Sequence, residues 1–186
     1  MRLIVFGGLL LMIAWGSLLS CNKWKDKKAV NDPRLTNPYC NDPNAVNYNV
    51  GFPGKPDNTI CIYPTDLFRG TYLVKDSIYK DDTLFIRADS FLMTIQALSQ
   101  TKLSMTGFCP SGSSLSMTAG ISYIATIDTN VGDTTTRSIG QTFCRIQDTI
   151  TGTLTRDLVD TTKLRINFQV VSDTGVTSYL GHAMKQ

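Results

Sequence analysis

The chain has 186 residues, a formal net charge of +3 at pH 7 and 9% aromatic residues. All 15 acidic residues are aspartates, and threonine occurs 23 times, so a strong helix former is missing while a β-branched residue is abundant. This composition argues against a mainly helical protein. Because positive charge is concentrated only near residue 25, it also argues against a nucleic-acid partner.

The first twenty residues form an apolar leader. Arg2 supplies a positive start, and residues 3–20 are almost wholly apolar; as a helix they would span roughly 27 Å, the lower limit for a bilayer. The run ends in Leu18-Leu19-Ser20-Cys21, which resembles the lipobox of bacterial lipoproteins. That resemblance implies that residues 1–20 are a cleaved signal peptide and that Cys21 carries the lipid anchor. An uncleaved transmembrane anchor is the alternative.

Residues 21–36 have the composition of a polar tether that follows the lipid. Four lysines in it, Lys23, Lys25, Lys27 and Lys28, favour contact with anionic lipid headgroups. In the resembling family an Asp directly after the Cys retains the protein in the inner membrane, whereas this chain has Asn22. We therefore expect an outer-membrane lipoprotein on the periplasmic side, with surface display as the alternative.

Four cysteines remain once Cys21 is lipidated, an even number that suits disulfides in an exported protein. Three pairings are possible, and proximity in the sequence favours Cys40–Cys61 and Cys109–Cys144. Four free thiols are the first alternative. A zinc site is the second, although the chain has no C-x-x-C pair and a single histidine, His182.

Residues 37–65 are rich in Asn, Asp, Pro and Gly, a composition that makes turns. A Cys40–Cys61 disulfide would close a loop of about 20 residues and stabilise it by about 3 kcal/mol. The segment resembles a short module of exported Gram-negative proteins that reads C-x-D-P-x-A-x-N-Y-N and then C-x-Y. The resemblance suggests calcium, with Asp42 and Asp57 as weak ligand candidates. We favour the alternative that both aspartates cap turns, and we expect no metal.

Residues 66–186 show the alternation of apolar and polar residues that is typical of β-strands. The clearest case is 163–171, where Leu164, Ile166, Phe168 and Val170 share one face. Further strands are predicted at 68–74, 83–87, 91–97, 103–107, 114–119, 121–127, 135–143, 149–155 and 176–180. The sequence thus predicts an all-β, antiparallel barrel or open sandwich of about eight strands.

This region also resembles the small lipocalin-like β domains of Gram-negative envelope lipoproteins. The resemblance is carried by 68–72, 101–108, 140–142, 150–154 and 164–170, in that order. It implies a meander that curls into a barrel, and it says little about chemistry. Lipocalins usually carry G-x-W in their first strand, where this chain has Gly70-Thr71-Tyr72.

Candidate catalytic groups are scarce. His182 is expected in a frayed tail, Gly112-Ser113-Ser114 does not complete a G-x-S-x-G turn, and the pairs Asp81–Asp82 and Asp157–Asp160 fall where hairpin turns belong. The sequence contains no phosphate-loop or dinucleotide motif. We therefore expect no enzyme activity and no cofactor.

Two functions remain. The first is a membrane-anchored structural or interaction module that docks another envelope protein or a glycan. The second is a carrier that holds a small apolar, lipid-like ligand inside the barrel. The expected inward residues are bulky and favour a filled scaffold: Phe91, Met93, Met105, Tyr123 and Phe168. Three small ones could border a pocket: Gly107, Ala125 and Gly152.

Overall fold

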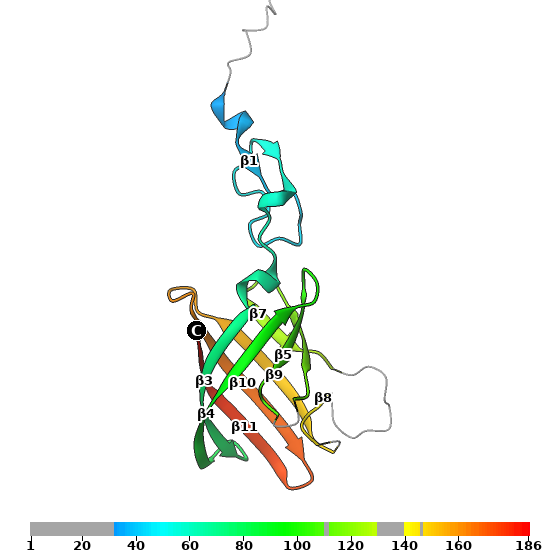
Figure 1. The fold of residues 1–186 in the computed structure, drawn as a ribbon, viewed down its shortest axis with the longest axis vertical. Coiled ribbons are helices and arrows are strands. Elements are labelled where there is room, and N and C mark those ends of the chain that lie inside the picture. The colour runs from blue at the N-terminus through cyan, green and yellow to red at the C-terminus, as the bar shows by residue number, and fades with distance from the viewer. Residues whose placement is uncertain (1–31, 110–111, 130–139, 146) are drawn as a thin grey trace, which may run out of the picture.

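A computed structural model describes residues 32–109, 112–129, 140–145 and 147–186. In these ranges the chain forms a small N-terminal module, a short connecting helix and a β-barrel, arranged one after another along the long axis (Figure 1). No helix within the described ranges is long and apolar enough to cross a membrane. The predicted signal peptide, the lipidation of Cys21 and most of the tether lie outside the described residues.

The N-terminal module has little regular structure. It contains two 3₁₀ helices, η2 (Pro33–Thr36) and η3 (Asn58–Ile60), and two short parallel strands, β1 (Pro38–Tyr39) and β2 (Lys55–Pro56). The Cys40–Cys61 disulfide joins its two halves, with Cα atoms 5.0 Å apart. The Asn47 amide does the same with hydrogen bonds to the Ile60 carbonyl and from the Ile62 amide. With so few buried apolar residues, such a segment needs a covalent link to hold its shape.

A third 3₁₀ helix, η4 (Pro64–Leu67), connects the module to the barrel. The Asp66 carboxylate accepts a hydrogen bond from the Tyr63 amide at 2.9 Å. The Thr65 hydroxyl donates to the Ser99 carbonyl at 3.0 Å, and Arg156 donates to the Leu67 carbonyl. The first bond caps η4, and the other two fix it against one end of the barrel.

Eight antiparallel strands close the barrel in the described part of the chain. They are β3 (Gly70–Lys80), β4 (Leu84–Ala97), β5 (Lys102–Thr106), β6 (Leu115–Ala119), β7 (Ile124–Ile127), β9 (Thr149–Arg156), β10 (Lys163–Ser172) and β11 (Gly175–Lys185). Each pairs with its neighbour in chain order, and β11 returns to β3. The short β8 (Gln141–Thr142) adds to the start of β9. The predicted all-β antiparallel fold is confirmed, and it is the closed barrel rather than the open sandwich.

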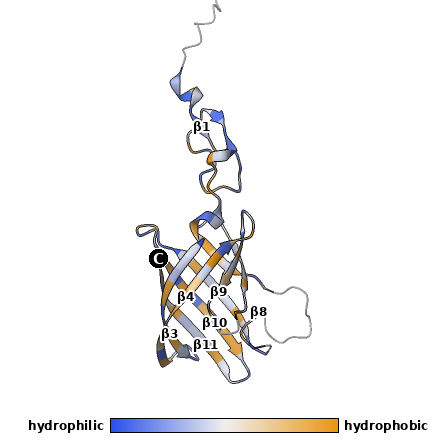
Figure 2. Cartoon of the chain, in the orientation of Figure 1, coloured by the Kyte–Doolittle hydropathy of each residue, from blue (hydrophilic) through white to orange (hydrophobic). Residues whose placement is uncertain are grey.

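Bulky side chains fill the barrel interior. The predicted inward face of β10, which carries Leu164, Ile166, Phe168 and Val170, is buried. Hydrophobic and hydrophilic residues are mixed along the labelled barrel strands (Figure 2). The largest fully buried side chains are Phe68, Tyr72, Met93, Ile95, Leu103, Met105, Leu115, Met117, Ile150, Leu154, Leu164 and Phe168. Most of the interior is therefore a packed core.

Some expected boundaries are wrong. The strands predicted at 83–87 and 91–97 are one long strand, β4, and the strand predicted at 68–74 continues to Lys80. Ile121 and Tyr123 do not belong to an inward strand face: Ile121 is 58% exposed and Tyr123 has a φ of 64°. Both lie in the turn before β7, because the short connection from β6 uses these residues to reverse direction. Most of the predicted strand 135–143 lies outside the described residues, which contain only β8 there.

Gly152 is required by the close approach of β9 to β10. Its φ is +135°, and a Cβ atom there would lie 2.2 Å from the Asn167 carbonyl oxygen and 2.9 Å from the Phe168 ring. A side chain at this position would strain the backbone and push the two strands apart.

Gly152→Ala is expected to lower the free energy of unfolding by about 2 kcal/mol. Urea denaturation of the variant and the parent chain measures the difference. Gly120→Ala is the matched control, because a Cβ there meets its nearest atom at an ordinary 3.5 Å. Equal losses in the two variants would contradict the assignment.

Candidate functional site

The two ends of the barrel differ. At the end that meets η4, Phe68 and Tyr72 are buried, and the Tyr72 hydroxyl donates to the Phe68 carbonyl at 2.8 Å. The opposite end carries the β3–β4 and β10–β11 turns and the Cys109–Cys144 disulfide. It lies away from the N-terminal module (Figure 1). We call this opposite end the mouth.

An aromatic cluster occupies the mouth, with Phe108 at its centre. The centroid of the Phe108 ring lies 4.7 Å from that of Phe91, 5.2 Å from Phe168, 6.4 Å from Phe143 and 6.3 Å from Tyr179, all edge to face. Such pairs add to the stability that burial provides. They hold the Phe108 ring against the end of the core.

A pocket of about 340 Å³ opens beside this cluster. Its walls combine aromatic with charged side chains: Asp76, Arg87, Asp89, Phe91, Gly107, Phe108, Phe143, Cys144 and Tyr179. We call it the mouth pocket. Its volume lies at the lower end of the range for sites that bind small molecules.

Asp76 is the unusual residue of the mouth pocket. It is 4% exposed, and neither carboxylate oxygen has a hydrogen-bond partner within the part of the chain that the structure describes. Burial, and then the charge of Asp89, raises the pKa of the Asp76 carboxyl above its usual value. Burial also raises the pKa of Tyr179, with the Asp76 charge as a further cause.

The strand pleat explains how a carboxylate comes to face the interior. In β3 the side chains of Tyr72, Val74, Asp76 and Ile78 alternate with outward ones and are all buried. Opposite Asp76 on β11 stands Gly181, where a Cβ atom would lie 2.8 Å from the Asp76 Cβ. The missing side chain lets β11 approach the backbone of Asp76 closely. Sequence reasoning did not single out Asp76 as a site residue, although its even spacing from Tyr72 and Val74 was the available signal.

The other charged groups of the mouth pocket already pair with each other. Arg87 donates to the Asp89 carboxylate at 3.2 Å, and the two side chains are 65% and 43% exposed. A pair in contact with water is worth little energy. Arg87 nevertheless makes its ion pair with Asp89, and Asp76 has no hydrogen-bonded cation among the described residues.

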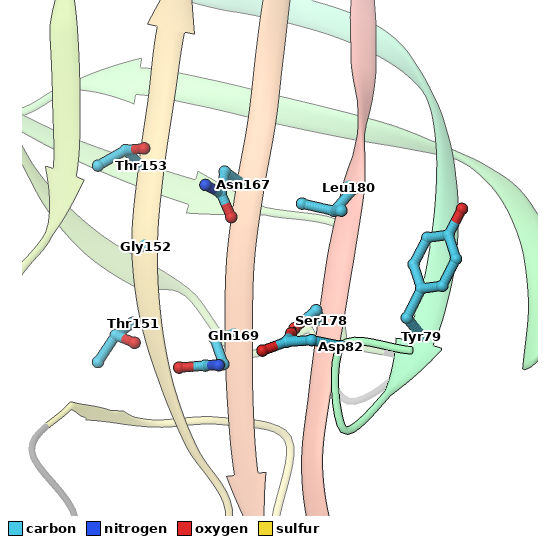
Figure 3. Close-up of a pocket in the computed structure, with 9 residues that line it drawn as sticks. All are labelled: Tyr79, Asp82, Thr151, Gly152, Thr153, Asn167, Gln169, Ser178 and Leu180. Atoms are coloured by element: carbon cyan, nitrogen blue, oxygen red, sulfur yellow. The ribbon is translucent and has the colours of Figure 1, made fainter. Parts of the chain in front are cut away.

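A second depression lies on the outer wall of the barrel (Figure 3). Its volume is about 470 Å³, and its lining is mostly polar: Tyr79, Asp82, Thr151, Gly152, Thr153, Asn167, Gln169, Ser178 and Leu180. The Ser178 hydroxyl donates to the Asp82 carboxylate. This outer groove offers amides and hydroxyls to solvent, and we find no buried unpaired group in its lining.

The structure separates the residues that the sequence offered for catalysis. His182 lies within β11 opposite Lys75, so the expected frayed tail is wrong. Its exposure follows from an outward position on the strand. Asp81 and Asp82 lie in the β3–β4 turn and Asp157 and Asp160 around the β9–β10 turn, as the sequence predicts. None of these residues lines the mouth pocket.

Asp42 and Asp57, the weak calcium candidates, both use their carboxylates within turns. Asp42 accepts hydrogen bonds from the Asn44 amide at 2.9 Å and the Tyr63 hydroxyl at 3.0 Å, which lower its pKa. Asp57 accepts from the hydroxyl and the amide of Thr59 at 2.6 and 2.9 Å, which lowers its pKa in the same way. In the described ranges no group of three or more Asp, Glu, His or Cys side chains is placed to hold a metal ion.

No family model matches the chain, and no curated protein matches it. Two solved structures are similar over 66% of the chain. One is a redesigned beta barrel, with 18% identity, 95% of that chain covered and a TM-score of 0.40. The other is EF1p2_mFAP2b bound to DFHBI, with 14% identity, 97% of that chain covered and a TM-score of 0.42.

The disulfide at the mouth gives a first prediction for this site. Replacing Cys109 and Cys144 together by Ser is expected to lower the barrel's free energy of unfolding by about 3–4 kcal/mol, because the bond closes a long loop. Urea denaturation measures the loss. The matched control replaces Cys40 and Cys61, and should leave the barrel transition within about 0.5 kcal/mol of the parent. An unchanged barrel after loss of the mouth disulfide would contradict the prediction.

Asp76 gives the second prediction for this site. The pKa of Asp76 is higher in the folded chain than the ordinary 3.8. The folded state therefore loses stability as pH rises from the ordinary pKa to the raised one. Asp76→Asn is therefore expected to be more stable than the parent at pH 7, by about 1 kcal/mol. The advantage should shrink towards pH 3, where Asp76 is protonated in both states. Denaturation curves at several pH values measure both effects.

Asp128 supplies the control of opposite sign. Burial opposes ionisation there, but hydrogen bonds from Lys102, Ser116 and Thr118 prevail and lower its pKa. Asp128→Asn should therefore lose stability at pH 7. A destabilised Asp76→Asn variant at that pH would overturn the account of Asp76.

Proposed function

We propose that this protein is a lipid-anchored, non-catalytic interaction module of the Gram-negative outer membrane, held by Cys21. The observation that carries the proposal is that the two ends of the barrel, which lie along the long axis of the molecule, differ in structure. The chain enters the barrel at a closed end, while the opposite end carries the mouth pocket. A module built in this way meets its partner at the end farthest from its anchor.

Packing favours the module over a carrier of lipid-like ligands. Side chains such as Phe168, Met93 and Leu154 occupy the space that an acyl chain would need. The remaining mouth pocket is small, and Asp76, Asp89 and Arg87 line it. An apolar ligand would desolvate these groups without pairing them, which is unfavourable. The carrier of an apolar ligand is therefore the weaker candidate.

The sequence supports the anchored position. The run Leu18-Leu19-Ser20-Cys21 follows an apolar leader, and lysines follow the cysteine. Lipidation adds about 0.8 kcal/mol of membrane affinity for each buried methylene, so several acyl chains hold a protein stably. The proposed anchor and the barrel mouth would then lie on opposite sides of the N-terminal module and the barrel core.

Cys21→Ala is expected to abolish lipid attachment and to leave an uncleaved precursor. Metabolic labelling with an alkyne fatty acid, followed by gel analysis, measures both. The chain in which Ser replaces both Cys109 and Cys144 is the matched control and should label like the parent. Undiminished label on Cys21→Ala would refute the anchor.

Site-specific photocrosslinking tests the direction in which the module faces. A photoreactive amino acid at Asp173, in the exposed β10–β11 turn at the mouth, is expected to give a discrete crosslinked product in native membranes. The same amino acid at Val159, which is 95% exposed in the turn at the closed end, is the control and should give none. Equal crosslinking from both positions, or none from Asp173, would contradict the proposal.

A further inference from the structure

We propose that the mouth pocket binds a small organic cation, an amine carried on an apolar group, whose ammonium pairs with Asp76. The inference rests on the proposed function, because it assigns a ligand class to the end of the barrel that we take as the binding end. Three properties of the mouth pocket point to this chemistry: an unpaired carboxylate, aromatic walls and an unbalanced charge.

The first property is the missing partner of Asp76. Both carboxylate oxygens are buried and unbonded among the described residues, whereas nearly all buried polar atoms in proteins are hydrogen-bonded. A carboxylate lacks donors, and it is satisfied by a ligand that has donors and positive charge. An ammonium group has three donors and no acceptor, so it can pair with both oxygens.

The second property is the aromatic lining. Phe91, Phe108, Phe143 and Tyr179 make up four of the nine lining residues. Aromatic faces attract cations, and the attraction is strongest where water is excluded. The same rings can pack against the apolar part of an amine. This lining favours an organic amine over a hydrated metal ion, which would need several more oxygen ligands.

The third property is the charge balance. Arg87 already pairs with Asp89 at 3.2 Å, which leaves the Asp76 carboxylate without a hydrogen-bonded cation in the part of the chain that the structure describes. A ligand with a single positive charge neutralises the pocket. A fatty acid or a phosphate would bring a second negative charge towards Asp76 and Asp89 and would be repelled.

The pocket volume sets the size of the ligand. Gly181 faces Asp76 across the β3–β11 pair without a side chain, so no Cβ atom of β11 contacts Asp76 there. About 340 Å³ in total suits a compact molecule such as a single-ring amine. Larger amphipathic amines would have to project out of the mouth.

The test uses the full lipidated chain in detergent and ¹⁹F NMR of 4-fluorobenzylamine. 4-Fluorobenzyl alcohol is the matched neutral probe, and it also reports any partition into detergent. We expect the amine to bind at least about tenfold more tightly than the alcohol, as expected for a hydrogen bond to a charged group. Equal affinity of the two probes, or no binding of the amine up to about 10 mM, would overturn the proposal.

Two variants assign the binding to the mouth pocket. Asp76→Asn should weaken amine binding about tenfold or more and leave alcohol binding unchanged. Asp173→Asn removes another negative charge at the mouth end outside the pocket, and should change amine affinity less than about twofold. Equal effects of the two substitutions would show that the amine is attracted only by general negative charge, and would reject the mouth pocket as its site. The crosslink from position 173 does not depend on these outcomes, so failure of the amine proposal is distinguishable from failure of the interaction module.

Discussion

The pairing of β11 with β3 is the constraint on which the rest of the molecule depends. It joins the last strand to the first in a continuous antiparallel register from Thr177 opposite Lys80 to Lys185 opposite Tyr72. Without it the sheet would have two exposed edges with unpaired backbone groups. With it, the inward side chains of all eight strands face one another and form a single core. The same pairing brings Gly181 next to Asp76, at a point where the two strands lie too close for a side chain on β11.

Much of the barrel could be predicted because alternation along a strand is a local property. The inward face of β10 could be predicted from Leu164 to Val170, because the polarity of each residue indicates which face of the strand it occupies. The closure of the barrel could not be predicted in the same way, because it depends on a pairing between residues about 100 positions apart. The turn at Ile121 and Tyr123 was misassigned for a related reason: both are apolar and fit the alternation, while the geometry of the short β6–β7 connection decides their position.

The mouth pocket was harder to predict than the fold. Asp76 was visible as an aspartate in a strand, but polarity alone places such a residue on the wet face. Only the phase of the neighbouring residues, Val74 and Ile78, puts it inside. The aromatic cluster combines residues from five separate segments, and its centre, Phe108, follows the end of β5. The two disulfides, in contrast, follow the pairing that proximity in the sequence favours.

An even number of strands has a practical consequence. Because the meander makes eight passes, Gln186 lies beside Thr71, where the backbone N–H of Gln186 donates to the Thr71 carbonyl at 2.9 Å. The polypeptide thus leaves the barrel at the end by which it enters. A fluorescent protein or affinity tag joined after Gln186 would sit next to η4 and the N-terminal module, on the side of the proposed anchor. A tag inserted in the Asp173 turn would lie at the opposite end of the barrel. Comparing the two tags would therefore show which end of the barrel faces the membrane.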